Sequence, residues 1–124
     1  MSMNSQSEPR HHSLISADRV EGTTVYNTEG EKLGHVEDVM LHKLSGKVAY
    51  AVVSCGGFLG VGEKYLPMPW SLLRYDTNKS GYVVPASRST LQEAPSFASQ
   101  EMGADDSDWR DRVHTHYNAP AYWI

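Results

Sequence analysis

The hydrophobic residues between Leu14 and Pro85 fall into short runs that are separated by turn residues. This spacing is typical of a small β-rich domain. The most apolar run, Lys47 to Ser54, contains β-branched, aromatic and small side chains without regular polar alternation. It predicts a central strand that is buried on both faces.

The segment before it, Leu33 to Leu44, alternates between apolar and polar residues, with one slip at Asp38-Val39. A single slip is what a β-bulge produces, and bulges help strands to bend around a barrel. The same residues also fit one face of a helix. We favour the strand because Gly34 interrupts the helical pattern and Ser45-Gly46 is typical of a tight hairpin turn into the next strand.

Shorter elements are expected on either side of this pair. Ser16 to Gly22 predicts one helical turn, with Ser16 as the N-cap and Gly22 as the C-terminal stop. Ser87 to Ala94 predicts the start of a helix through a weak capping box of Ser89 and Gln92. Further strands are expected at residues 23–26, 63–70, 72–76 and 82–85, with turns at 27–30 and 77–81.

The positions of the prolines and glycines add to the predicted order of strands and turns. Pro67 and Pro69 lack backbone donors, so their segment belongs at a sheet edge or a strand end. Four glycines lie between two apolar segments and predict a structural corner: Gly56, Gly57, Gly60 and Gly62. With about six short strands and few helices, the pattern predicts an all-β fold, either a small sandwich or a barrel.

The two ends of the chain differ from its middle. Residues 1–13 predict a disordered leader, residues 14–95 the folded domain and residues 96–124 a C-terminal extension. Within the extension, residues 108–117 predict a helix that carries Trp109, Val113 and Tyr117 on one face. We expect these side chains, with the terminal Tyr122 and Trp123, to pack on the domain or on a second subunit.

The composition excludes several classes of protein. The chain has 124 residues, of which 40% are hydrophobic and 21% charged, as expected for one globular domain. Its net charge of −4 gives no reason to expect nucleic-acid binding, which usually needs a basic patch. We find neither a signal peptide nor an apolar stretch near the roughly 20 residues of an integral membrane segment. Cys55 is the single cysteine, which excludes an intrachain disulfide, and together these features predict a cytoplasmic protein.

The glycine-rich loop also invites a phosphate-binding interpretation. Such sites need the loop to open onto a helix N-terminus, whereas Glu63 to Met68 has the pattern of a strand. The Glu63 carboxylate would also repel phosphate, so we interpret the glycines as structural. Phe58 and Leu59, inside the loop, either fold back onto the core or form a contact surface.

Catalytic and metal-binding patterns are weak. His114 and His116 are spaced i and i+2, which places them on different sides of a helix, and zinc sites usually need three or four ligands. Glu37 and Asp38 are adjacent, so a strand would point them to opposite faces. Cys55 has no base near it in sequence and is expected to be a buried structural thiol. We therefore assign no catalytic, cofactor-binding or metal-binding residue.

A series of motifs occurs in a recognisable order: Gly30 to Met40, Ser45 to Val53, Gly56 to Tyr65, and Pro69-Trp70. This order resembles the PRC-barrel family, which includes the cytoplasmic domain of the photosynthetic reaction-centre H subunit and the C-terminal domain of the ribosome maturation factor RimM. The resemblance implies a six-stranded β-barrel that acts through protein contacts and has no shared catalytic residues. The aromatic tail is similar to the extension found on some stand-alone bacterial members.

The function we expect is that of a non-enzymatic protein–protein interaction or adaptor module that forms a homodimer, with no cofactor and no nucleic acid as partner. The candidate contact surface consists of aromatic and apolar side chains: Phe58, Leu59, Trp109, Tyr117, Tyr122 and Trp123. One alternative is a small-ligand or metal-binding regulator with its site at the glycine corner or near His114 and His116. A weaker alternative is an RNA- or ribosome-associated factor, against which the acidic charge argues.

Overall fold

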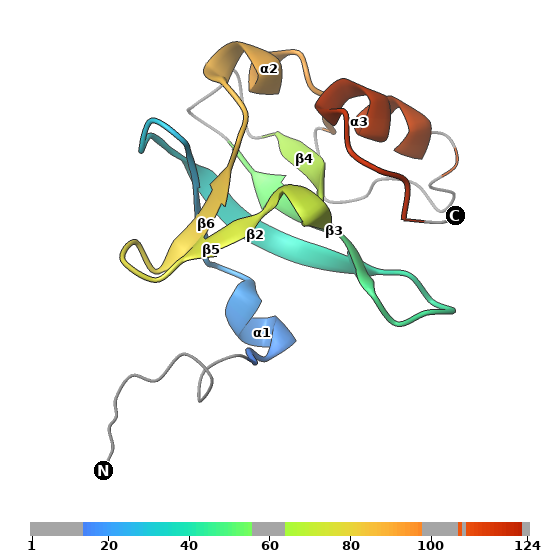
Figure 1. The fold of residues 1–124 in the computed structure, drawn as a ribbon, viewed down its shortest axis with the longest axis horizontal. Coiled ribbons are helices and arrows are strands. Elements are labelled where there is room, and N and C mark those ends of the chain that lie inside the picture. The colour runs from blue at the N-terminus through green and yellow to red at the C-terminus, as the bar shows by residue number, and fades with distance from the viewer. Residues whose placement is uncertain (1–13, 56–63, 98–106, 108, 123–124) are drawn as a thin grey trace.

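The computed structural model describes residues 14–55, 64–97, 107 and 109–122 and shows one six-stranded sheet with short helices (Figure 1). The strands are β1 (Thr24–Asn27), β2 (Lys32–Leu41), β3 (Val48–Ser54), β4 (Tyr65–Pro69), β5 (Arg74–Asp76) and β6 (Gly81–Val84). The helices are α1 (Ala17–Val20), the 3-10 turn η3 (Trp70–Leu72), α2 (Arg88–Gln92) and α3 (Arg110–Tyr117). The view in Figure 1 places α1 below the strands and α2 and α3 above them. The predicted β-rich fold with six strands is confirmed.

The strands follow the order β4-β3-β2-β1-β6-β5, in which β1 and β6 run parallel and all other neighbours run antiparallel. Within the described residues, the two outer strands β4 and β5 do not pair with each other, so the hydrogen-bonded ladder is open where a closed barrel was expected. The outer edge of β4 explains this. Pro67 and Pro69 have no N–H to donate there, and the N–H and C=O of Tyr65 bond to Phe97 instead. The two prolines therefore lie at a sheet edge, as predicted.

The pairing of β2 with β3 confirms the predicted hairpin and bulge. The register shifts between Val36 and Asp38, directly before the predicted slip at Asp38-Val39, and again between Met40 and Leu41. Gly46 has a φ of +77° in the connecting turn. Gly34 permits the close approach of the two strands, because a Cβ atom there would lie 1.8 Å from the carbonyl oxygen of Ser54. The helical alternative for this segment is wrong.

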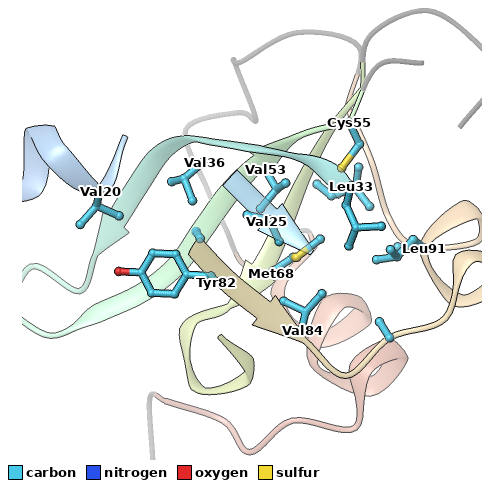
Figure 2. Close-up of a cluster of buried hydrophobic side chains, with 14 residues drawn as sticks. Val20, Val25, Leu33, Val36, Val53, Cys55, Met68, Tyr82, Val84 and Leu91 are labelled. Atoms are coloured by element: carbon cyan, nitrogen blue, oxygen red, sulfur yellow. The ribbon is translucent and has the colours of Figure 1, made fainter. Parts of the chain in front are cut away.

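A first hydrophobic cluster fills the inner face of the sheet (Figure 2). It receives side chains from five strands and from helices α1 and α2, so the sheet curves around it. Its fully or nearly fully buried members include Val25, Val36, Val53, Met68, Val84 and Leu91. Trp70 packs against this cluster with its ring centroid 5.5 Å from that of Tyr82.

A second cluster covers the opposite face of β3. It joins Tyr50 and Val52 of β3 to Trp109 and Val113 of the C-terminal extension. Tyr117 packs against both clusters. The prediction that β3 is buried on both faces is therefore confirmed, and so is the shared face of the three extension residues.

The helix caps differ from the prediction in one place. Ser87, and not Ser89, is the N-cap of α2, and its Oγ accepts the N–H of Thr90 at 3.2 Å. The predicted capping box of Ser89 with Gln92 is wrong, because the helix begins two residues earlier than that box requires. Helix α1 is confirmed, with Ser16 at its N-cap position and Gly22 beyond its end at a φ of +90°.

Candidate functional site

Tyr50 is the centre of an aromatic cluster between β3 and the C-terminal extension. The rings of Trp109, His114 and Tyr122 lie edge-on to it, with centroid distances of 5.1, 5.4 and 5.4 Å. His42, in the turn between β2 and β3, reaches Tyr122 at 5.4 Å. Edge-to-face packing is a favoured arrangement of aromatic rings. These contacts fasten the extension to its own sheet.

Hydrogen bonds fix His114 in this cluster. Its Nδ1 donates to the carbonyl of Ala119 at 3.3 Å, since a carbonyl only accepts. In the neutral ring the other nitrogen, Nε2, then accepts the O–H of Tyr50 at 2.8 Å. His114 is 7% exposed, and both of its nitrogens are bonded within the fold.

His116 lies on the same helix but serves a different contact. Its Nε2 donates to the carbonyl of Thr90 at 2.7 Å, which ties α3 to α2. As expected for a helix, His114 and His116 have different partners and do not form one site. The described residues contain no group of three or more His, Cys, Asp or Glu side chains placed to hold a metal ion.

Cys55 is a buried thiol that follows β3. Burial raises its pKa to about 12, so the sulfur stays protonated at neutral pH and is a poor nucleophile. Burial also raises the pKa of Tyr117, and the nearby Cys55 raises it further. The Tyr117 hydroxyl is buried and has no hydrogen-bond partner among the described residues. The expectation of a structural Cys55 therefore agrees with its environment.

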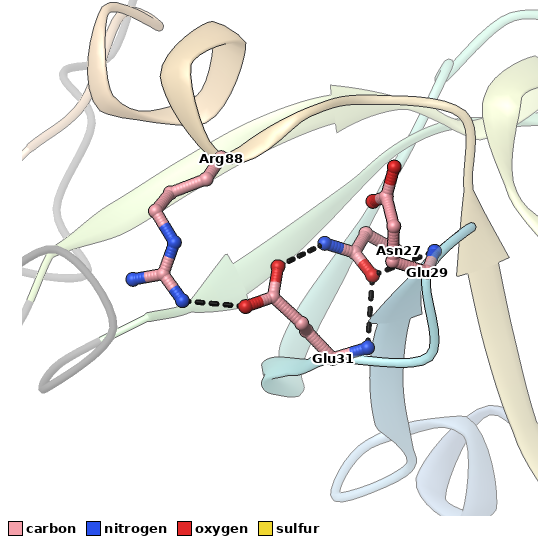
Figure 3. A network of polar contacts seen from close by, with 4 residues as sticks. All are labelled: Asn27, Glu29, Glu31 and Arg88. Atoms are coloured by element: carbon pink, nitrogen blue, oxygen red, sulfur yellow. Dashed lines mark hydrogen bonds and ion pairs between the residues drawn. The ribbon is translucent and has the colours of Figure 1, made fainter.

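A polar network links the turn after β1 to α2 (Figure 3). Asn27 is 1% exposed, and its Oδ1 accepts the backbone N–H groups of Glu29 at 3.0 Å and Glu31 at 2.8 Å. Its Nδ2 donates to one oxygen of the Glu31 carboxylate at 2.7 Å, and Arg88 donates to the other. The hydrogen bonds from Arg88 and then Asn27 lower the pKa of Glu31.

Exposed apolar side chains occur away from both clusters. Leu41 and Leu44, at the hairpin between β2 and β3, are 59% and 93% exposed. Tyr75, on the edge strand β5, is 47% exposed. Leu14 and Ile15, which precede α1, are also exposed. Exposed apolar groups that gather at one feature are the usual mark of a contact surface.

The predicted contact residues are placed only in part. Trp109 is 3% exposed, and the partly buried Tyr117 and Tyr122 also pack against the chain's own sheet. The other predicted contact residues and the four loop glycines lie outside the described residues: Phe58, Leu59, Trp123, Gly56, Gly57, Gly60 and Gly62.

The exposed residues at the hairpin and at the edge strand were not singled out from the sequence. Leu44 directly precedes the turn residues Ser45-Gly46, where an apolar side chain has no strand neighbour to cover it. The position of Leu44 directly before this turn could therefore have identified it as an exposed residue from the sequence. The exposure of Tyr75 depends on which strand lies at the edge, and the sequence pattern alone does not determine this order.

Comparison with known proteins identifies a family. The sequence model of the PRC-barrel domain matches residues 12–91, which is more than half of the chain and includes all six strands. No curated protein is similar enough in sequence to count as a relative. In the described part of the chain, each helix is too short or too polar to cross a membrane.

Proposed function

The chain belongs to the PRC-barrel domain family, and we propose that it is a non-enzymatic protein–protein interaction module that associates with a second copy of itself. Domains of this family are generally non-catalytic. His114 and Cys55 have side chains that could support catalysis or metal binding, but in this fold both side chains are buried and contribute to packing. His114 is bonded on both nitrogens, and the pKa of Cys55 is raised by burial.

The observation that carries the proposal is the set of exposed apolar side chains on an otherwise well-packed domain. Leu41, Leu44 and Tyr75 leave about half or more of their surface in water. Full burial of a large apolar side chain contributes roughly 1.5–3 kcal/mol of transfer free energy, which offsets part of the cost of association. Association therefore has a driving force at these positions. Phe58, Leu59 and Trp123 remain predicted members of the contact surface.

Size-exclusion chromatography with light scattering tests self-association. The full chain is loaded over a concentration series from about 1 to about 500 µM, a range that detects weak interfaces. We expect the weight-average mass to rise from that of one chain towards that of two. A constant monomer mass over the whole series would contradict the proposed self-association.

A further inference from the structure

We propose that the second copy pairs along β5, with the two edge strands antiparallel and a two-fold axis at Tyr75. The inference rests on the proposed self-association and adds to it the surface and the register. Three features of the described residues support it, and they concern the two sheet edges, the charges on β5 and the carboxylate of Asp76.

The two edges of the sheet differ in their capacity to accept a further strand. On β4, Pro67 and Pro69 lack donors and the backbone of Tyr65 is already bonded to Phe97. On β5, the described residues pair with β6 alone, and no other described strand pairs with the opposite side of β5. An unpaired edge presents backbone donors and acceptors to another chain. The edge that can accept a second copy is therefore β5.

The charges on β5 are self-complementary about Tyr75. An antiparallel pair centred on this residue places Arg74 opposite Asp76 of the second copy, and the same pair forms again on the other side of the axis. Directly opposite side chains in such a pair have Cβ atoms about 4.5–5.5 Å apart, which suits an ion pair. The neighbouring two-fold registers place Arg74 opposite Arg74 or Asp76 opposite Asp76, so like charges disfavour them.

Asp76 is held in place before any partner arrives. Its Oδ1 accepts the backbone N–H groups of Asn78 at 2.8 Å and Lys79 at 3.3 Å in the turn that follows β5. A carboxylate that is already fixed loses less conformational freedom when it pairs. Because β5 is short and its ion pairs are exposed, the dimer is expected to be weak, reversible and sensitive to salt.

Cysteine cross-linking tests the register. In the Tyr75→Cys variant the two new thiols of a dimer face each other within the distance that a disulfide spans, so mild oxidation should convert most of the dimer to a covalent species. The matched control is Glu93→Cys, an exposed position at the end of α2 that lies outside the contact residues named above. Both variants retain the buried native thiol, Cys55. Equal cross-linking of the two variants would overturn the inference.

Charge reversal tests the same interface without a disulfide. Arg74→Glu places like charges opposite each other and should raise the dimer dissociation constant about tenfold or more. Arg74→Lys keeps the charge and should change the constant by no more than about threefold. If the wild-type chain dimerises and Arg74→Glu leaves the constant unchanged, the β5 interface is wrong but self-association stands. If the wild-type chain stays monomeric, both proposals fail.

Discussion

At the scale of single residues, Asn27 determines the shape of the turn between β1 and β2. Its side chain satisfies two backbone N–H groups and also holds the carboxylate of Glu31. Arg88 then joins this turn to α2 through the second carboxylate oxygen of Glu31. One buried amide therefore organises a contact between segments that lie far apart in the sequence.

This network predicts a pH-dependent contribution to stability. The pKa of Glu31 is lower in the folded chain than its ordinary value of 4.5, mainly because Arg88 bonds to the carboxylate. Its contribution is therefore present above the unfolded pKa and is lost as the pH falls through the folded pKa. Urea unfolding of the wild type and Glu31→Gln from neutral to acidic pH measures it. The stability difference should shrink below about pH 4.5.

Arg88→Met is the control for the cause of this shift. It removes the main bond that lowers the pKa of Glu31, so its stability should depend less on pH than that of the wild type over the same acidic range. Parallel pH profiles for the wild type and both variants would contradict the assignment.

At the scale of elements, the burial of β3 on both faces depends on the C-terminal extension, which packs on one of them. One face of β3 lies on the inner cluster, and the other is covered by Trp109 and Val113, which follow the residues matched by the family model. An apolar strand that is buried on both faces needs both layers. We therefore regard α3 as an integral part of this domain.

The variant Trp109→Ala measures the contribution of this cover. Removing a buried tryptophan that contacts Tyr50 should lower the free energy of unfolding by about 3–5 kcal/mol, as in other large-to-small core substitutions. Chemical denaturation gives the value. The control Leu44→Ala changes an exposed side chain and should stay within about 0.5 kcal/mol of the wild type. A loss for Trp109→Ala as small as that for Leu44→Ala would show that the extension does not stabilise the sheet.

Local pattern was sufficient to predict some of these elements. The apolar run of β3, the bulge near Asp38 and the hairpin at Gly46 were predictable, because each leaves its mark within a few residues. The cap of α2 was not, since Ser87 and Ser89 are both suitable capping residues. Contacts between distant segments had no local signal at all.

The contacts of the candidate site also join distant segments, so local sequence patterns could not predict them. The hydrogen bond from Tyr50 to His114 joins residues 64 positions apart. The position of β5 at an edge follows from the parallel pairing of β1 with β6, which no short motif announces. Trp109, Tyr117 and Tyr122 were correctly expected to pack on the domain or on a second subunit, but only the fold shows that they pack on their own sheet. Trp123 lies outside the described residues.

At the scale of the whole molecule, the sheet has one protected edge and one edge that no other described strand pairs with. Prolines and the bridge to Phe97 protect β4, whereas β5 presents Arg74 and Tyr75 to solvent. Natural proteins commonly protect the edges of their sheets against unwanted pairing. Strand β5 is short and charged but contains no proline, and its charges are self-complementary, so it is suited to association with a second copy in one register.

A native mass spectrum of the purified full chain, recorded at low and at high ionic strength, tests the central claim most directly. The account predicts bare monomer and dimer masses, with a dimer fraction that grows with concentration and falls as the salt increases. A monomer at every concentration would contradict self-association. An additional mass retained on the folded chain would contradict the assignment as a contact module without cofactor and would favour a ligand-binding function.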